Sequence, residues 1–341
     1  MKRLTIIAVL LISLQMQAQN VIIHDPVMAV ENGKYYLFAT GMGVQILSST
    51  DMKDWQKEGS VFGKAPEWAV NSVPGYRGHT WAPDIQKVGD MWWLFYSCSS
   101  FGKNTSAIGL AVNKTLDKNN PSYQWIDKGV VVRSNGKSTN WNAIDPNLII
   151  DKKGKKWLCW GSFWDGIQLA QLNIKKNLDA LPFDKEKIKG TPKTIARRHA
   201  TNKNLSKEDL ALADEAPDAG PNAIEAPFIV YRDGYYYLFA SWDYCCKGPR
   251  STYKTVVGRS KDIRGPYVDR SGKDMADGGG DIIMQADSLY YGIGHCGVYE
   301  VNDQWYIIAH GYDRSDFGAS KLVIRRLSFD DQGWVSIEKN S

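Results

Sequence analysis

The stretch VMAVENGKYYLFATG, residues 27–41, consists of two strand-like runs separated by an Asn-Gly pair. Branched and aromatic residues favour extended strands, and Asn-Gly supplies the positive φ angles of a two-residue hairpin turn. The stretch therefore predicts a β-hairpin. The same pattern returns along the chain as DIQKVGDMWWLFYSC (84–98), NLIIDKKGKKWLCWGS (147–162), FIVYRDGYYYLFASW (228–242) and GVYEVNDQWYIIAHG (297–311).

Further strand-like runs follow the hairpins and lengthen the repeat. They are VQILSST (44–50), AIGLAVN (107–113), GIQLAQLN (166–173), TVVGRS (255–260) and KLVIRRLSF (321–329). Five units of three or four antiparallel strands predict an all-β, five-bladed β-propeller that occupies residues 19–341 as a single domain. A β-sandwich is the alternative all-β fold, but it does not predict repeats in phase.

One segment, from Asn177 to Gly220, breaks the repeat. It is rich in Lys, Glu and Asp, and its SKED run from Ser206 to Asp209 is typical of a helix start. We expect an elaborated connection between the third and fourth blades, with its charges facing solvent.

Residues 1–18 have the layout of a secretory signal peptide. Lys2 and Arg3 precede the apolar run LTIIAVLLISL, and the small residue Ala18 closes the segment. The apolar run is too short to span a bilayer. We therefore expect cleavage near Ala18, no membrane span, and a mature protein that is secreted or periplasmic.

Composition narrows the range of partners. The formal net charge is +5, and no block of Lys and Arg is interleaved with aromatic residues, so we expect no nucleic-acid partner. The 13 Trp residues suit sugar faces as well as packed cores. We expect the mature chain to be a monomer.

The five cysteines form an odd set without zinc-type spacing. Cys98 and Cys159 lie in strand-like runs, where we expect them to be buried as small hydrophobic residues. Cys245 and Cys246 are adjacent, and they could close a vicinal disulfide in an oxidising compartment or remain as two free thiols. We expect no catalytic thiol.

Polar residues stand at the start of the first strand of each repeat, eight or nine residues before the turn. The first strand of a propeller blade is innermost, so side chains at this phase should meet around the central channel. A single acid before Pro is often only a turn cap, but three acids at one phase favour a functional cluster. The positions are Asp25, Thr80/Trp81, Asp145, Glu225 and His295.

Two of these acids lie in nearly identical phrases, NAIDP (142–146) and NAIEAP (222–227). Carboxylates held close together do not all ionise at neutral pH, so one can serve as a general acid while another stays ionised as a base. Glycoside hydrolysis uses such a pair, and a separation of about 6.5–9.5 Å leaves room for the water that inverts the sugar. Acids on different blades favour the wider separation, and hence inversion.

Seven stretches resemble glycoside hydrolase family 43, and within it the arabinanases. They are HDP (24–26), GHTWAPDI (78–85), NAIDPNL (142–148), WGSFWDGI (160–167), NAIEAPFI (222–229), DGGGD (277–281) and GHCGV (294–298). The resemblance covers essentially the whole mature chain. It implies a five-bladed propeller that cuts α-1,5-linked L-arabinofuranose chains with inversion.

The resemblance also implies roles for the clustered residues. Asp25 matches the general base, Glu225 the general acid, and Asp145 a third acid that stays ionised, raises the pKa of Glu225 and orients it. His295 matches a His that the family places near a metal, so we expect one calcium ion, coordinated mostly by water. The alternative for His295 is a hydrogen-bonded structural histidine. No organic cofactor is expected.

Candidate sugar contacts follow from the same resemblance. Trp81 and Trp164 are candidate stacking platforms, because aromatic faces suit the CH-rich faces of sugars. Asn142 and Ser162 match positions that hydrogen-bond the central sugar. His24, next to the expected base, either orients that base or contacts the substrate.

We expect an endo-acting arabinanase whose partners are arabinan and arabino-oligosaccharides. The alternatives are an exo-acting arabinanase, an α-L-arabinofuranosidase or a β-xylosidase of the same family, and, outside enzymes, a carbohydrate-binding propeller. Two features could shift the chain toward exo action. One is Cys296-Gly297, where the resembling arabinanases carry Asn-Ser, and the other is the segment from Asn177 to Gly220.

Overall fold

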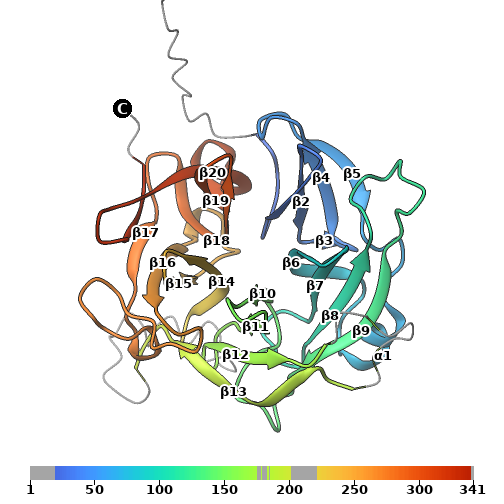
Figure 1. Ribbon diagram of the computed structural model, residues 1–341, viewed down its shortest axis with the longest axis horizontal. Helices are drawn as coiled ribbons and strands as arrows, with labels where there is room; N and C mark the ends of the chain where they lie inside the picture. The colour runs from blue at the N-terminus through green and yellow to red at the C-terminus, as the bar shows by residue number, and fades with distance from the viewer. Residues whose placement is uncertain (1–19, 175–177, 179–182, 184, 201–220, 339–341) are drawn as a thin grey trace, which may run out of the picture.

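The computed structural model describes residues 20–174, 178, 183, 185–200 and 221–338. Its strands form five antiparallel sheets arranged around a common centre (Figure 1). The five-bladed propeller predicted from the repeats is therefore confirmed. The expected signal peptide and the helix start expected at Ser206 lie outside the described residues.

Each blade consists of four strands in chain order. The first blade contains β1 (Val27–Glu31), β2 (Lys34–Ala39), β4 (Gln45–Ser49) and β5 (Gln56–Ser60). The second contains β6 (His79–Val88), β7 (Met91–Cys98), β8 (Ala107–Asn113) and β9 (Ile126–Arg133). The third contains β10 (Asn147–Ile150), β11 (Lys156–Trp160), β12 (Ile167–Leu172) and β13 (Ile188–Ala196).

The fourth blade contains β14 (Ile224–Arg232), β15 (Tyr235–Trp242), β16 (Lys254–Ser260) and β17 (Asp281–Met284). The fifth contains β18 (Tyr290–Val301), β19 (Gln304–Asp313), β20 (Ala319–Phe329) and β21 (Val335–Ile337). The two-residue β3 (Gly41–Met42) pairs with β6 and so joins the first two blades. Short helices occupy loops: α1 (Glu67–Ser72), η1 (Gly248–Arg250), η2 (Met275–Asp277) and η3 (Arg314–Asp316).

The hairpin turns behave as the sequence predicts. Asn32 and Gly33 have φ angles of 52° and 76°, which belong to a type I′ turn. Positive φ angles also occur at both residues of the Asp233-Gly234 and Asn302-Asp303 turns. These turns fix the register between the first and second strands, for example Val27 opposite Phe38 in the first blade.

The aromatic second strands supply much of the core. Phe38, Phe95 and Phe239 occupy the same register position in three blades and are almost completely buried. Each such side chain contributes roughly 1.5–3 kcal/mol by leaving water. The first strands β1, β6, β10, β14 and β18 contact one another around the ring, so they are innermost as expected.

The ends of the described chain close the ring on one strand. The amide of Ile23 donates to the carbonyl of Ser320 at 3.1 Å, and the amide of Leu322 donates to the carbonyl of Val21 at 2.9 Å. The last strand, β21, pairs with the other end of β20. Because both chain ends pair with β20, the fifth blade is locked to the first.

The segment from Asn177 to Gly220 contains more than the expected connection. Its described part includes β13, which is the fourth strand of the third blade. The sequence analysis missed this strand because only its last residues are buried and apolar. No helix in the described part of the chain is long and apolar enough to span a membrane.

One residue near the start of each first strand has a left-handed backbone. Asp25, Ala82, Asp145, Ala226 and His295 have φ angles of 52°, 42°, 57°, 55° and 51°. In three blades the β pairing shifts register at this point. A left-handed conformation costs about 1–2 kcal/mol for a residue with a Cβ, so the surrounding contacts must hold it in place.

The amide of each left-handed residue is held by the preceding blade. Thr40 Oγ1 accepts the amide of Ala82 at 2.8 Å, Ser97 Oγ that of Asp145 at 3.1 Å, and Ser241 Oγ that of His295 at 2.8 Å. His310 Nδ1 accepts the amide of Asp25 at 3.1 Å and so links the last blade to the first. The four acceptors occupy the same position, two residues after Phe38, Phe95, Phe239 and Ile308 at the end of the second strands.

The third blade has Gly161 at this position and offers no side-chain acceptor. A Cβ on Gly161 would lie 2.4 Å from the carbonyl oxygen of Gly166, so no larger residue fits. The carboxylate of Asp145 takes over, and its Oδ2 accepts the amide of Ala226 at 3.1 Å. Asp145 is therefore tied to both the second and the fourth blade.

We predict that Ser97→Ala lowers the free energy of unfolding by about 1–3 kcal/mol, because it leaves the buried amide of Asp145 without its acceptor. Chemical denaturation would measure this. Ser336→Ala is the matched control, since Ser336 lies exposed on β21. Equal stability of the two variants would show that the blade-to-blade bond contributes little.

Candidate active site

The site is built at the inner ends of the first strands. Asp25 lies just before β1 and is buried. Its Oδ2 accepts the hydroxyl of Thr40 at 2.5 Å, and its Oδ1 lies 2.9 Å from Nδ1 of His24 and 3.0 Å from Nδ1 of His295. Both carboxylate oxygens are therefore held by donors.

Electrostatics keep Asp25 ionised. Burial alone raises the pKa of this carboxyl, but the charges of His24 and His295 and their hydrogen bonds outweigh burial and hold the pKa well below its ordinary value. Burial likewise lowers the pKa of His295, but Asp25 outweighs it and raises the pKa to about 9. Asp25 and His295 thus form a buried ion pair at neutral pH.

Glu225 is held by two hydroxyl groups. Ser162 Oγ donates to Oε2 at 2.6 Å, and Tyr253 Oη donates to Oε1 at 2.8 Å. Ser162 also forms an isolated antiparallel bridge with Glu225, which connects the third and fourth blades. Tyr253 packs closely over Gly294, where an added Cβ would lie 2.3 Å from its ring.

The structure corrects the expected phase of Glu225. Phe228 and Asn147 are equivalent in register, and two residues before them lie Ala226 and Asp145. Ala226 is left-handed and precedes Pro227, as Asp145 is left-handed and precedes Pro146. NAIEAP is therefore NAIDP with one extra residue, and Glu225 precedes the position that Asp145 occupies in its own blade.

The surroundings of Asp145 disfavour the ionised form that the sequence analysis expects. Burial raises the pKa of its carboxyl well above the ordinary value; the positive charge of His295 opposes this, and the negative charges of Glu225 and Asp25 add to it. Neighbouring buried carboxyls titrate as a coupled group. Burial and the neighbouring negative charges thus favour the protonated form of Asp145, while the two oxygens of Glu225 accept two hydroxyl hydrogens.

The candidate sugar contacts separate into two kinds. Trp81 and Trp164 are partly exposed and remain available as stacking platforms. Asn142 is buried, and its Oδ1 accepts the hydroxyl of Ser106 at 2.7 Å. The hydroxyl of Ser162 is engaged by Glu225. Asn142 and Ser162 thus each have a hydrogen-bond partner within the protein, and Ser162 positions Glu225.

Sequence reasoning missed Thr40, Tyr253, His310 and Tyr312. Thr40 and His310 lie near the end of the second strand in their repeats, at the position that Ser97 and Ser241 occupy elsewhere. This column of polar residues was a readable signal. Tyr253 and Tyr312 gave none, because they lie among many other aromatic residues.

The second ring nitrogen of His24, Nε2, contacts a tyrosine and a cysteine. Its Nε2 lies 3.0 Å from Tyr312 Oη and 3.7 Å from the sulfur of Cys246. Tyr312 Oη in turn accepts the amide of Cys246 at 2.7 Å. All five cysteines are free thiols, so the vicinal disulfide is not formed in this structure. Cys98 and Cys159 are buried, as expected.

The described residues do not assemble a protein ligand set for calcium. Calcium takes six to eight oxygen ligands, whereas His295 contributes one imidazole whose Nδ1 faces Asp25. The two groups of potential metal ligands found among the described residues both contain His24, and neither contains His295. Calcium at His295 would depend almost entirely on water.

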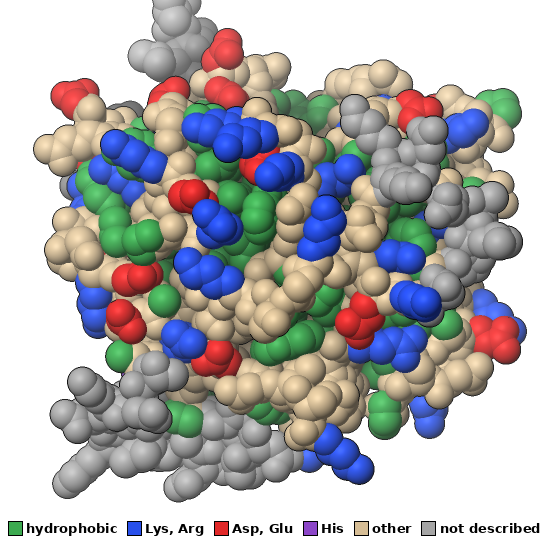
Figure 2. Space-filling model, turned by 60° about the horizontal axis from the view of Figure 1, so that its bottom comes forward, with side chains coloured by type: hydrophobic (Ala, Val, Ile, Leu, Met, Phe, Trp, Pro, Cys, Tyr) green, Lys and Arg blue, Asp and Glu red, His purple; other side chains and the backbone are tan. Residues whose placement is uncertain are grey.

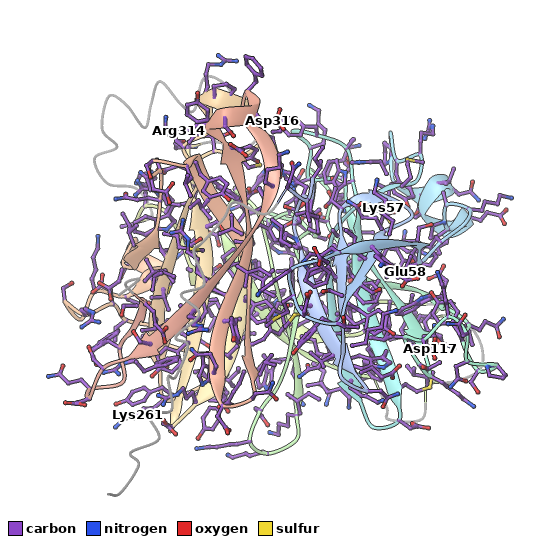
Figure 3. The ribbon with its side chains drawn as sticks, turned by 90° about the horizontal axis from the view of Figure 1, so that it is seen from above. Lys57, Glu58, Asp117, Lys261, Arg314 and Asp316 are labelled. Carbon is purple, nitrogen blue, oxygen red and sulfur yellow. The ribbon has the colours of Figure 1, made fainter. Side chains whose placement is uncertain are left out.

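The outer surface carries a mixture of charged and apolar side chains. On the face shown in Figure 2, Lys and Arg side chains are interspersed with acidic and apolar ones. Figure 3 shows Arg314 and Asp316, in the loop between the second and third strands of the last blade, at the end of the molecule opposite to Lys261. The loops between second and third strands and the left-handed residues belong to the same end, because second strands finish where first strands begin.

Comparisons with known proteins agree with this geometry. The family model described as glycosyl hydrolases family 43 matches residues 19–335. An extracellular exo-alpha-(1->5)-L-arabinofuranosidase of Cellvibrio japonicus (strain Ueda107) is 41% identical over 336 residues, covering 98% of this chain and 92% of that protein. An extracellular endo-alpha-(1->5)-L-arabinanase of Bacillus subtilis (strain 168) is 41% identical over 325 residues, covering 94% and 88%.

Solved structures show the same architecture. A crystal structure of an exo-1,5-alpha-L-arabinanase from a bovine ruminal metagenomic library has a TM-score of 0.84 and 57% sequence identity, and the match covers 95% of this chain and 99% of that chain.

The buried carboxyl of Asp84 should make the stability of the fold depend on pH. Its Oδ2 accepts the amide of Leu148 in the next blade at 2.6 Å. Burial raises the pKa of the Asp84 carboxyl to about 7, although hydrogen bonds from Leu148 and Asn147 oppose the shift. Because the pKa is raised on folding, stability is greatest below the unfolded pKa and is lost as pH rises through about 7.

We predict that Asp84→Asn removes this pH dependence, since Asn stays neutral. Relative to the wild type, the free energy of unfolding of the variant should rise by roughly 2–3 kcal/mol between about pH 5 and pH 8. Denaturation curves at both pH values would measure the difference. A constant difference across this range would contradict the raised pKa of Asp84.

Proposed function

The chain belongs to the glycosyl hydrolases family 43, and on that premise we propose that it hydrolyses α-1,5-L-arabinofuranosidic bonds in arabinan. The chain is therefore a glycoside hydrolase, and the non-catalytic carbohydrate-binding alternative is set aside. The observation that carries the substrate proposal is the combination of three buried inner carboxyls with relatives whose names specify arabinan bonds.

Asp25 serves as the general base. Its carboxylate is kept ionised by His24 and His295, so it can take a proton from a water molecule as that water attacks the anomeric carbon. Thr40 and His24 fix the orientation of the two oxygens. The lowered pKa keeps Asp25 in the ionised form and makes it a weaker base than an ordinary carboxylate.

Glu225 serves as the general acid, and Asp145 is the neighbouring carboxyl that interacts with it electrostatically. The two carboxyls come from adjacent blades, and burial together with the negative charge of Glu225 raises the pKa of Asp145. In the proposed step, protonated Glu225 donates its proton to the departing sugar oxygen and is left as a carboxylate, while Asp145 stays in place beside it. Ser162 and Tyr253 fix the position of Glu225.

We propose inversion because of where the acids stand in the ring. Asp25 enters the first blade and Glu225 the fourth, and the fifth blade with His295 lies between them. Glu225 and Asp145, by contrast, come from neighbouring blades. A wide separation of acid and base leaves room for the attacking water, which is the arrangement of inverting glycosidases.

For the mode of attack we propose exo action, which was an alternative to the endo action expected from sequence motifs. The relatives include both modes at equal identity. The solved structure described as an exo-1,5-alpha-L-arabinanase is 57% identical to this chain, compared with 41% for each of these two relatives. This likeness supports release of sugar units from a chain end.

Location, oligomeric state and metal remain proposals of the same kind. Two relatives are described as extracellular, which supports secretion through residues 1–18. We propose a monomer as the working unit. Calcium stays a prediction that chelation tests: activity that falls on treatment with EDTA and returns with added calcium would support it, whereas full activity after chelation would count against it.

We predict that Glu225→Ala and Asp25→Ala fail in different ways. Loss of the general acid should lower kcat on linear arabinan by roughly 10²–10⁴-fold. The same variant should lose far less on a dinitrophenyl arabinofuranoside, because that leaving group departs without a proton. Asp25→Ala should lose comparable activity on both substrates. Steady-state kinetics with both substrates would measure the split.

The wild type and Ser336→Ala serve as controls, since Ser336 lies on the exposed outer strand β21. Equal losses of Glu225→Ala on the two substrates would remove Glu225 from the role of general acid. If Asp25→Ala lost activity on arabinan but kept it on the dinitrophenyl arabinofuranoside, Asp25 would be the general acid and Glu225 the general base.

We also predict the products of linear arabinan. Exo action should release only short products from the beginning of the reaction, while endo action should give a ladder of oligomers. Early proton NMR should show the β anomer of arabinofuranose if the reaction inverts an α bond. Retention would contradict the proposed mechanism, and release of xylose from xylo-oligomers without action on arabinan would contradict the substrate.

A further inference from the structure

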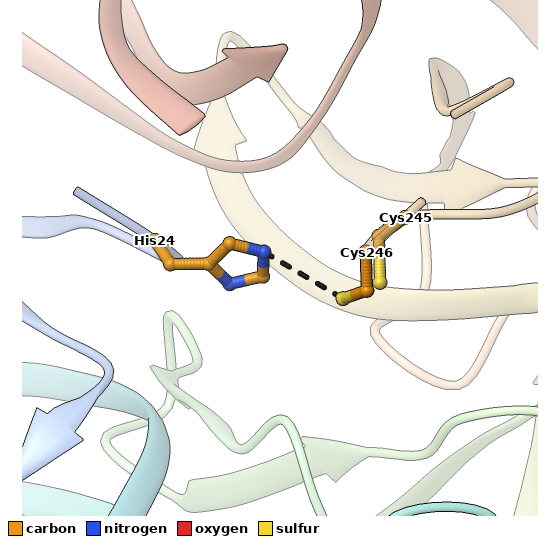
Figure 4. A group of neighbouring side chains, drawn as sticks. All are labelled: His24, Cys245 and Cys246. Carbon is orange, nitrogen blue, oxygen red and sulfur yellow. Dashed lines mark hydrogen bonds between the residues drawn. The ribbon is translucent and has the colours of Figure 1, made fainter. Parts of the chain in front are cut away.

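A second cluster lies next to the expected general base. His24, Cys245 and Cys246 each point one ligand atom into the same space, and these atoms all lie within 4.8 Å of one another (Figure 4). Cys246 is exposed, and His24 and Cys245 are partly exposed, so the cluster is open to solvent. Its residues come from two distant parts of the chain, the N-terminal segment and the loop between β15 and β16.

The spacing of the cluster suits a tetrahedral metal. The sulfur of Cys246 lies 3.7 Å from Nε2 of His24. Zinc binds sulfur at about 2.3 Å and imidazole nitrogen at about 2.0–2.1 Å, so two such ligands at a tetrahedral angle stand about 3.6 Å apart. The pair therefore needs almost no movement to share one ion. Cys245 supplies a third ligand, and water can take the fourth position.

The surroundings of His24 are those of a metal-binding imidazole. Its other nitrogen, Nδ1, lies 2.9 Å from Oδ1 of the buried Asp25. Metal-bound histidines usually donate this second N–H to a carboxylate, which fixes the tautomer and turns the free nitrogen toward the metal. Tyr312, at 3.0 Å from Nε2, is the contact that a metal would displace.

A second possible set, His24, Asp25 and His310, is less suitable. The oxygens of Asp25 are already held by Thr40, His24 and His295. Nδ1 of His310 accepts the amide of Asp25 and is needed to close the ring. Binding a metal there would break contacts on which the fold depends, whereas the two thiols can bind a metal without breaking such contacts.

We propose that His24, Cys245 and Cys246 form a binding site for a thiophilic divalent cation of the zinc class. Soft thiolates with imidazole select this class over calcium or magnesium. Binding releases the two thiol protons and the Nε2 proton of His24 to solvent, and leaves two thiolates and one neutral imidazole on the ion. The site is distinct from the calcium position expected at His295, because it uses none of the same ligands.

The site also provides a route to reversible inhibition, and this part of the proposal depends on the proposed hydrolytic function. A zinc ion held by two thiolates and a neutral imidazole carries no net charge, so its effect on hydrolysis would be steric. The ion and its bound water would occupy space at the edge of the site, beside the imidazole that orients Asp25. Hydrolysis should therefore fall as the site fills and recover when zinc is removed.

The binding test uses the purified mature chain kept reduced and freed of metal. Titration with cobalt should give one equivalent of binding, with the absorption of thiolate-to-cobalt charge transfer, and zinc should displace the cobalt. Cys246→Ser, Cys245→Ser and His24→Gln should each weaken zinc binding at least tenfold. Cys159→Ala is the control, since that thiol is buried in the core and should leave binding unchanged.

The activity test follows zinc inhibition of the wild type and of Cys246→Ser. The variant should keep hydrolysis without zinc and lose the inhibition. Failure to bind cobalt or zinc would overturn the proposal, as would binding that all three variants retain. Binding through the three ligands in a protein that does not cut arabinan would uphold the metal site and reject the proposed function instead.

Discussion

The hydrogen bond between the end of one second strand and the start of the next blade is the constraint on which the site depends. It holds a left-handed residue whose backbone is unfavourable, and repeats this around the ring through Thr40, Ser97, Ser241 and His310. Without that bond a buried amide would lack a partner, at a cost of about 1–3 kcal/mol. The same contact therefore joins adjacent blades and turns the polar side chains toward the centre.

Sequence reasoning predicted much of this because the fold repeats itself. Five hairpins with matching turns fix the number of blades, and an innermost first strand follows from the architecture. Asp25, Asp145 and His295 were identified by counting back from the turns, and the structure places all three at the left-handed position. The outer strand β13 was missed because its residues are mostly polar and face solvent.

The counting failed at Glu225 for a physical reason. Distance from the turn counts residues, but the turn of the third blade is longer, with Ile150 opposite Lys156. Counting back nine residues therefore reaches the left-handed Asp145 in that blade, but reaches Glu225, one residue before Ala226, in the fourth blade. Alignment on the left-handed position, which Pro follows in four blades, would have matched Asp145 with Ala226. The contacts of Glu225 with Ser162 and Tyr253 were beyond reach, since loops from two blades bring them together.

The difference between Asp145 and Glu225 follows from one missing side chain. Gly161 cannot carry a hydroxyl because the carbonyl of Gly166 occupies that space. The fourth blade therefore takes its acceptor from Asp145, which becomes fixed between two blades and cannot approach the substrate freely. The side chain of Glu225, one residue before Ala226, does not have to accept this backbone amide. Its two carboxylate oxygens instead accept hydroxyl groups. The chain thus separates the carboxyl that supports the ring from the carboxyl that is free to transfer a proton.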